Sequence, residues 1–202
     1  MGAGRELDPP PAQFRAAVEQ LRSVRLRPEI ELTEVPAPQR IAPFATALGA
    51  DVVVGDRDIG TGRLVLLHDP AGNDSWEGTF RCVTFVRAEV DPEMVRDPML
   101  AAVAWSWLTD AWQGHRLGVT APSGTVTVVL SEGFGNIAGD GLTAQVEVRA
   151  SWTPSEDGRD AAPVHELPGH VEAWAEVLGA ASGLVPVTSG VVALPRRHGA
   201  RG

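Results

Sequence analysis

The sequence contains no lysine and no tyrosine, and it has a single cysteine, Cys82. One cysteine excludes an internal disulfide, and no apolar run is long enough to span a membrane as a helix. No signal peptide is recognisable at the N-terminus, which predicts a cytoplasmic location. Because every basic residue other than histidine is arginine, and alanine, glycine, valine and proline are abundant, the composition is typical of a GC-rich coding genome.

Positive charge is also scarce, since the formal net charge is -9. Affinity for phosphate backbones and anionic lipid comes from clustered positive charge, so direct binding to nucleic acid or to a membrane surface is not expected. The basic stretch 196–201 is short, and we interpret it as a solvated end. A role in RNA metabolism would therefore have to act through a protein partner.

A chain of 202 residues is expected to form one domain, in which about 70% of the unfolded chain's surface is buried. We predict a loose leader over residues 1–10 and a single domain over 11–183. Residues 184–202 are predicted to be a tail, with one short strand around Val191 and Val192 as an option.

The spacing of apolar residues predicts three helices and a meander of strands. The helices begin near Gln13, Pro98 and Gly169, and the strands cover residues 44–54, 63–68, 76–90, 125–134 and 142–152. The element order is therefore α-β-β-β-α-β-β-α. This order predicts an α+β fold with one antiparallel sheet of about five strands and helices on one face. Residues 28–45 stay open, with 29–33 as a possible edge strand, and 55–62 is predicted to be a turn-rich connector.

The helix predicted over 98–113 is apolar around roughly 200° of its circumference, about twice the usual apolar stripe. Trp107 lies in the middle of that arc and is expected to face the sheet together with four smaller residues, Leu100, Val103, Ala104 and Ala111. A flanking ridge of Trp105, Leu108 and Trp112 needs a second cover. That cover is either the last helix, through Trp174, or another protein.

His68 and Asp69 end a predicted strand, a position where catalytic side chains are common. Asp69 could orient His68 as a general base, although Asp-Pro is also a frequent turn start. Together with Trp76 and Arg81, the pair defines a candidate site for a small-molecule enzyme or sensor. A deep pocket that joins the four side chains would favour this hypothesis.

Other motifs predict little chemistry. The five histidines and Cys82 show no zinc-type spacing, so neither a metal nor another cofactor is expected. The glycine-rich stretch 133–139 is followed by a strand, which indicates a hairpin loop instead of a phosphate loop. Arg81, Arg87 and Arg149 occupy outward strand positions, where cross-strand ion pairs are the simple interpretation and an anion site is the alternative.

Four segments carry a resemblance to a known family: 62–70, 76–81, 105–108 and 149–154. They resemble an uncharacterised actinobacterial family of unknown function, the DUF3000 family. The resemblance implies a cytoplasmic bacterial protein and transfers no catalytic residue. The element order is also similar to that of type III secretion chaperones, an analogy of topology alone.

The leading hypothesis is thus a non-enzymatic module that binds protein, as a homodimer or with another protein partner. The central helix, through Trp105, Leu108 and Trp112, or an exposed sheet surface would carry the contact.

Overall fold

The computed structural model describes residues 9–155 and 164–186. In these ranges six strands form one antiparallel sheet in the order β1-β2-β3-β4-β6-β5. The strands are β1 (Ile30–Val35), β2 (Phe44–Val54), β3 (Arg57–Asn73), β4 (Gly78–Val90), β5 (Gly118–Glu132) and β6 (Leu142–Ser155). The chain is thus an α+β protein, as its sequence predicts.

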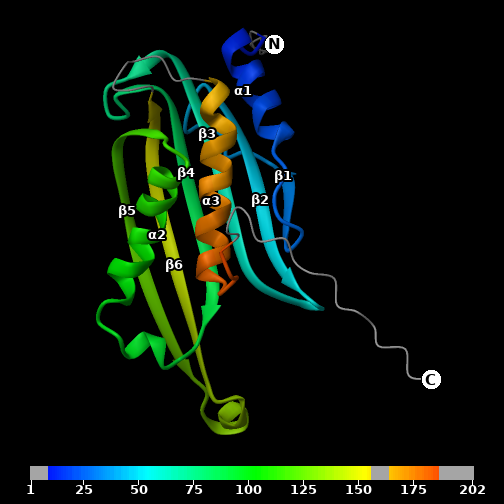
Figure 1. Ribbon diagram of the computed structural model, residues 1–202, viewed down its shortest axis with the longest axis vertical. Helices are drawn as coiled ribbons and strands as arrows, with labels where there is room; N and C mark the ends of the chain where they lie inside the picture. The colour runs from blue at the N-terminus through cyan, green and yellow to red at the C-terminus, as the bar shows by residue number, and fades with distance from the viewer. Residues whose placement is uncertain (1–8, 156–163, 187–202) are drawn as a thin grey trace, which may run out of the picture.

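The three α-helices lie on one face of the sheet (Figure 1). They are α1 (Ala12–Ser23), α2 (Leu100–Gly114) and α3 (Leu167–Ala181). Three short 3-10 helices lie in the connections: η1 (Met94–Arg96) before α2, η2 (Gly135–Asp140) between β5 and β6, and η3 (Val164–Glu166) before α3. Helix α3 crosses the middle of the sheet, and Trp174 of α3 and Trp152 of β6 are completely buried in the core beneath it. We call this side the helix face and the opposite side the open face.

The strands differ from the prediction in two ways: β3 begins earlier than expected, and β1 raises the count from five to six. Residues 55–62, predicted to be a connector, contain a tight turn at Gly55 and Asp56, after which β3 begins at Arg57. The edge strand considered for 29–33 exists as β1 and adds one strand to the predicted order. The short strand considered near Val191 lies outside the described residues.

The central helix forms where the sequence predicts it, but it is rotated about its axis. Leu100, Ala104, Leu108, Ala111 and Trp112 are its buried residues. Val103 is exposed and Trp107 is only half-buried, which corrects the expectation that these two face the sheet. Because the apolar arc of this helix covers roughly 200° of its circumference, periodicity alone could not fix which part of the arc packs inward.

Gly62 of β3 explains how closely α3 approaches the sheet. A Cβ atom at Gly62 would lie 2.9 Å from Cζ2 of Trp174 and 3.3 Å from Cδ2 of Leu178. We expect Gly62→Ala to reduce the free energy of unfolding by about 1–3 kcal/mol, because a packed indole ring cannot yield without moving its neighbours. Urea denaturation measures the loss.

Gly114→Ala is the matched control for that change. A Cβ atom at Gly114, the last residue of α2, meets no atom within 4 Å. The same substitution there is expected to leave stability unchanged or to raise it by up to about 1 kcal/mol. Equal effects at both glycines would contradict the close packing of α3.

Candidate functional site

His68 and Asp69, the candidate base and its partner, occupy structural positions. The His68 ring lies on the helix face between aromatic rings, with centroids 4.2 Å from Phe80 and 5.9 Å from Phe14. Its Nδ1 is 3.0 Å from the carbonyl oxygen of Thr79 and so carries the proton that it donates there. Asp69 accepts a hydrogen bond from the backbone N–H of Ala71, as in an Asx-turn. Burial lowers the pKa of His68, so the ring is neutral.

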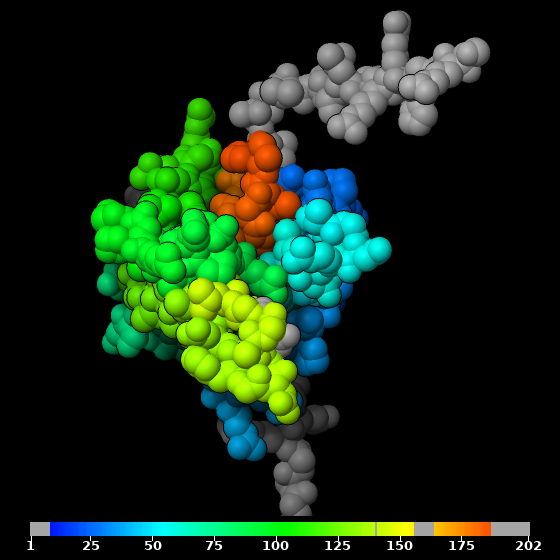
Figure 2. Space-filling view, turned by 90° about the horizontal axis from the view of Figure 1, so that it is seen from below, coloured from blue at the N-terminus to red at the C-terminus, as the bar shows by residue number. Residues whose placement is uncertain are grey.

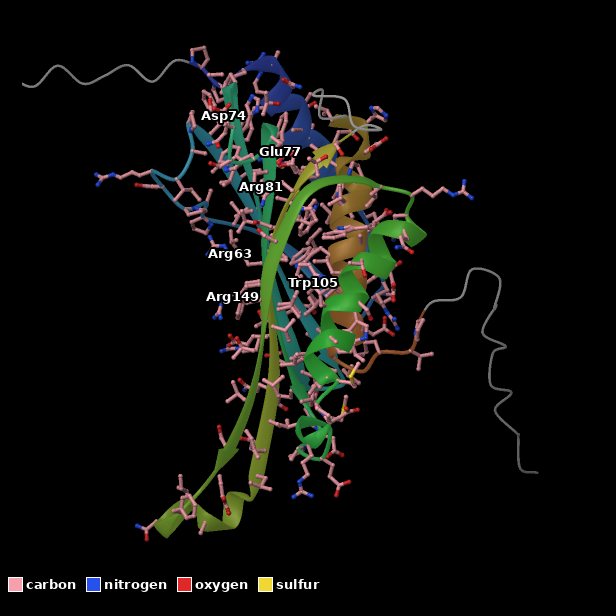
Figure 3. The ribbon with its side chains drawn as sticks, turned by 90° about the vertical axis from the view of Figure 1, so that its left-hand side faces the viewer. Arg63, Asp74, Glu77, Arg81, Trp105 and Arg149 are labelled. Carbon is pink, nitrogen blue, oxygen red and sulfur yellow. The ribbon has the colours of Figure 1, made fainter. Side chains whose placement is uncertain are left out.

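Trp76 and Arg81 lie on the opposite side of the sheet from His68. Arg81 points to the open face (Figure 3), and Trp76 packs against a small apolar cluster there that includes Val65 and Leu67. Because successive side chains of a strand alternate between faces, Phe80 supports His68 while Arg81 faces away. The structure therefore keeps Trp76 and Arg81 together but separates them from His68, which corrects the predicted four-residue site.

The predicted ridge of Trp105, Leu108 and Trp112 is largely inside the molecule. Leu108 is completely buried, and the Trp112 ring packs at 5.1 Å from that of Trp152. Both residues belong to the same core cluster as Trp174 of α3, so the cover is intramolecular. Only Trp105 is half-buried, and it lies on the helix side of the sheet (Figure 3). The ridge consequently offers no continuous surface to a partner.

The exposed apolar surface is instead at one end of the molecule, where β5 and β6 extend as a long hairpin (Figure 1). We define the apolar hairpin surface as the large hydrophobic residues that are exposed on this hairpin and on the nearby η1–α2 segment. They are Met94, Met99, Val103, Val129, Leu130, Phe134, Ile137 and Leu142. Figure 2 looks onto this end and shows the hairpin tip in yellow-green beside the green η1–α2 segment.

The strand register explains why these side chains are uncovered. Leu130 pairs with Ala144, and Leu142 lies two residues before Ala144, so both side chains point to the helix face. Val129 pairs with Gln145 and points to the open face. The α2 helix begins only at Leu100 and leaves this end of the hairpin uncovered. Phe134 and Ile137, in the loop at the tip, are 73% and 59% exposed. An apolar patch of this kind is typical of protein interaction sites.

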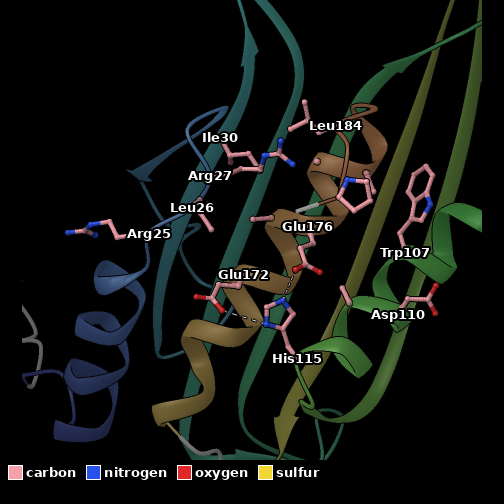
Figure 4. Close-up of a pocket in the computed structure, with 15 residues that line it drawn as sticks. Arg25, Leu26, Arg27, Ile30, Trp107, Asp110, His115, Glu172, Glu176 and Leu184 are labelled. Carbon is pink, nitrogen blue, oxygen red and sulfur yellow. Dashed lines mark hydrogen bonds and ion pairs between the residues drawn. The ribbon is translucent and has the colours of Figure 1, made fainter. Parts of the chain in front are cut away.

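A groove lies between the helices (Figure 4). Its volume is about 480 Å³, its floor is formed by small residues of α3 such as Ala175 and Gly179, and Trp107 forms one wall. His115 lies between two carboxylates, with Nε2 2.9 Å from Glu176 and Nδ1 3.5 Å from Glu172. The charged lining residues of the groove have both signs, Arg25 and Arg27 against Asp110, Glu172 and Glu176, so the groove shows no preference for a ligand of one charge.

Two further buried ionisable groups, His170 and Cys82, are held in neutral forms. His170 accepts a hydrogen bond at Nδ1 from the indole N–H of Trp152, at 3.1 Å, and burial lowers its pKa to about 3. Burial raises the pKa of the Cys82 thiol to about 12. Within 9–155 and 164–186, no three histidine, cysteine or acidic side chains gather closely enough to hold a metal ion.

The exposed apolar residues in the hairpin loop were not predicted from the sequence. The sequence assigned residues 133–139 to a hairpin loop without weighing the exposure of Phe134 and Ile137. The signal was present, because a turn-forming segment rarely needs two large apolar residues. None of the helices in the described part of the chain is long and apolar enough to cross a bilayer.

Comparison with known proteins identifies a family but no activity. No curated protein and no solved structure matches the chain. A family model described as "Protein of unknown function (DUF3000)" matches residues 10–192, which include the whole described sheet and all three helices. The chain therefore belongs to the DUF3000 family.

Proposed function

We propose that this chain is a cytoplasmic, non-enzymatic module that binds protein, and that its partner is a second copy of itself. The observation that carries the proposal is the apolar hairpin surface, which holds eight of the eleven large hydrophobic residues exposed in the described chain. Burying such side chains against a partner is favourable in proportion to the apolar area removed from water. The sheet edge beside them supports a second copy as the occupant.

Strand β5 is an edge strand, and within residues 9–155 and 164–186 no other strand faces its outer hydrogen-bonding groups. Its residues 123–131 contain no charge and no proline, and five of the nine are threonine or valine. Natural proteins guard exposed edges with charge, proline or short length, because an unguarded edge pairs readily with another strand. The residues of β5 therefore favour the addition of a strand from outside.

The opposite edge of the sheet is guarded. Strand β1 is only six residues long, and it carries two exposed carboxylates, Glu31 and Glu34. The ion pair between Glu34 and Arg22 of α1 occupies part of this edge. Two copies that pair antiparallel along β5 would be related by a two-fold axis, the commonest symmetry of dimers. The pairing would satisfy the outer hydrogen-bonding groups of the β5 strands in both copies.

The test is a pair of lysine substitutions on β5, Thr127→Lys with Val129→Lys. In a two-fold arrangement the added charges of the two copies lie close together, so we expect the dimer to dissociate at least about 100-fold more readily. Sedimentation velocity over a concentration series measures the dissociation constant, and circular dichroism shows that the fold is kept.

The matched control places two lysines on the other edge, Glu31→Lys with Thr33→Lys in β1. Both residues are exposed, so this variant is expected to fold and to dimerise like the wild-type chain. A wild-type chain that stays monomeric at high micromolar concentration contradicts the proposal. So does a dimer that resists the β5 change and is lost with the β1 change.

A further inference from the structure

A shallow pocket of about 480 Å³ lies on the open face, near the middle of the sheet. Its walls come from four strands, and its apolar part is formed by Val65, Val83 and Phe85. Its charged lining residues are both arginines, Arg63 and Arg149, in a chain whose formal net charge is -9. Figure 3 shows both on the side of the sheet away from the helices. The local charge is thus opposite to that of the chain as a whole.

Arg81 lies behind the same pocket and is only 6% exposed. Its guanidinium group donates hydrogen bonds to three hydroxyl groups, at 2.8 Å to Ser151, 3.2 Å to Thr153 and 3.4 Å to Ser123. Among the described residues, no carboxylate forms an ion pair with Arg81 or with Arg63. Glu77 interacts electrostatically with Arg81 but forms no ion pair with it, so part of the Arg81 charge stays uncompensated in a region of low dielectric.

Two of the hydroxyl groups that accept hydrogen bonds from Arg81 also face the pocket. Ser123 and Ser151 both line it, and their oxygen atoms are 3.2 Å apart. Each accepts from Arg81, and one of them donates to the other, so one hydroxyl proton is left to donate to a ligand. Thr153 uses its own proton on the carbonyl oxygen of Trp76. The pocket therefore offers a polarised hydroxyl donor between two arginine side chains.

The guanidinium group of Arg149 also lies over the Phe85 ring, 5.1 Å from its centroid, and forms an ion pair with Glu147 at 2.8 Å. The Arg149 guanidinium group has five N–H donors, and the Glu147 carboxylate accepts hydrogen bonds from only some of them. An arginine stacked on an aromatic ring, with free donors at its edge, suits an anion that carries a flat apolar body.

We propose that this pocket binds a small organic anion, in which a phosphate or carboxylate group is joined to an apolar or aromatic body. The anionic group accepts a hydrogen bond from the free seryl hydroxyl and further hydrogen bonds from the guanidinium groups of Arg63 and Arg149. The apolar body lies on Val65, Val83 and Phe85. This inference does not require the proposed dimer, because all the residues that line the pocket belong to one copy of the chain, although Ser123 is part of β5.

Phenyl phosphate and benzoate are the probes, with inorganic phosphate and benzyl alcohol as their separate halves. Titrations are followed by the NMR signals of the arginine Nε–H groups. We expect at least one of the two aromatic anions to bind saturably at millimolar concentration or below, and about tenfold more tightly than either half. The tighter of the two identifies the preferred anionic group.

Arg149→Gln is expected to weaken that binding about tenfold, and Ser151→Ala about fivefold, because each removes one polar contact to the anion. Arg149 is more than half exposed, so its variant keeps the fold even if changes at Arg81 do not. Arg57→Gln, on an exposed arginine at the start of β3, is the matched control and should leave binding unchanged. Absence of saturable binding, or equal losses in all three variants, overturns the proposal.

Discussion

Replacing Trp152 with alanine is expected to reduce the free energy of unfolding by about 4 kcal/mol, within the range for large buried aromatics. Trp152 is completely buried, packs against the Trp112 ring at 5.1 Å, and donates its indole N–H to His170. The substitution removes a large apolar surface, opens a cavity between β6 and the helices, and leaves the acceptor on His170 without a partner. Chemical denaturation monitored by far-UV circular dichroism measures the loss.

Trp152→Phe separates the two contributions, because it keeps a ring in the core but removes the N–H donor. We expect it to lose less than half as much stability as the alanine variant. Trp107→Ala serves as the control for removing an indole, since Trp107 is half-exposed on the outer side of α2. If the Trp107 variant lost as much stability as the Trp152 variant, the position assigned to the core would be wrong.

Acidification is expected to destabilise the chain strongly between about pH 6.5 and pH 3. His170 has a pKa of about 3 in the folded chain against an ordinary value of 6.5, because burial disfavours its charged form. In that interval the unfolded chain binds a proton that the folded chain does not. Stability therefore falls as the pH falls, by about 1.4 kcal/mol per pH unit for this one group. His68, whose pKa is also lowered, acts in the same direction.

His170→Asn tests the origin of the acid sensitivity. The asparagine oxygen can accept the Trp152 N–H in place of Nδ1, and the amide does not titrate. The variant is less stable at neutral pH because it leaves a small cavity, but the slope of its unfolding free energy against pH should be shallower. Trp107→Ala, which removes no ionisable group, should keep the wild-type slope. An unchanged slope in the His170 variant would assign the acid sensitivity to other groups.

The fold class was predictable because its strongest signals are long and regular. The alternation of Ala144, Val146, Val148, Ala150 and Trp152 predicts one buried face of β6, and all five are buried. The helical spacing of Phe14, Ala17 and Leu21 likewise predicts the buried side of α1. In both cases polar residues mark the other side, so the pattern has a direction.

The errors arose where the same residue type serves two purposes. In the sequence Gly60 and Gly62 indicate a connector, yet both lie inside β3. They are glycines because α3 packs so closely on β3 that a Cβ atom at either position would clash with it. Glycine within a strand can mark a close approach as readily as a turn. The candidate site was harder still, because the pairing of Arg81 with Ser123 and Ser151 joins residues distant in the sequence. No local pattern contains that information.

The difference between the two edges of the sheet also limits how far the chain can assemble. A molecule with two adhesive edges would join head to tail without end and grow into a fibre. In the proposed dimer both β5 edges are paired, and only the two β1 edges stay free. Strand β1 is short and acidic, so these edges do not favour pairing with a further copy. We therefore expect the proposed assembly to end at the dimer, so that raising the protein concentration increases the fraction of dimer without producing a filament.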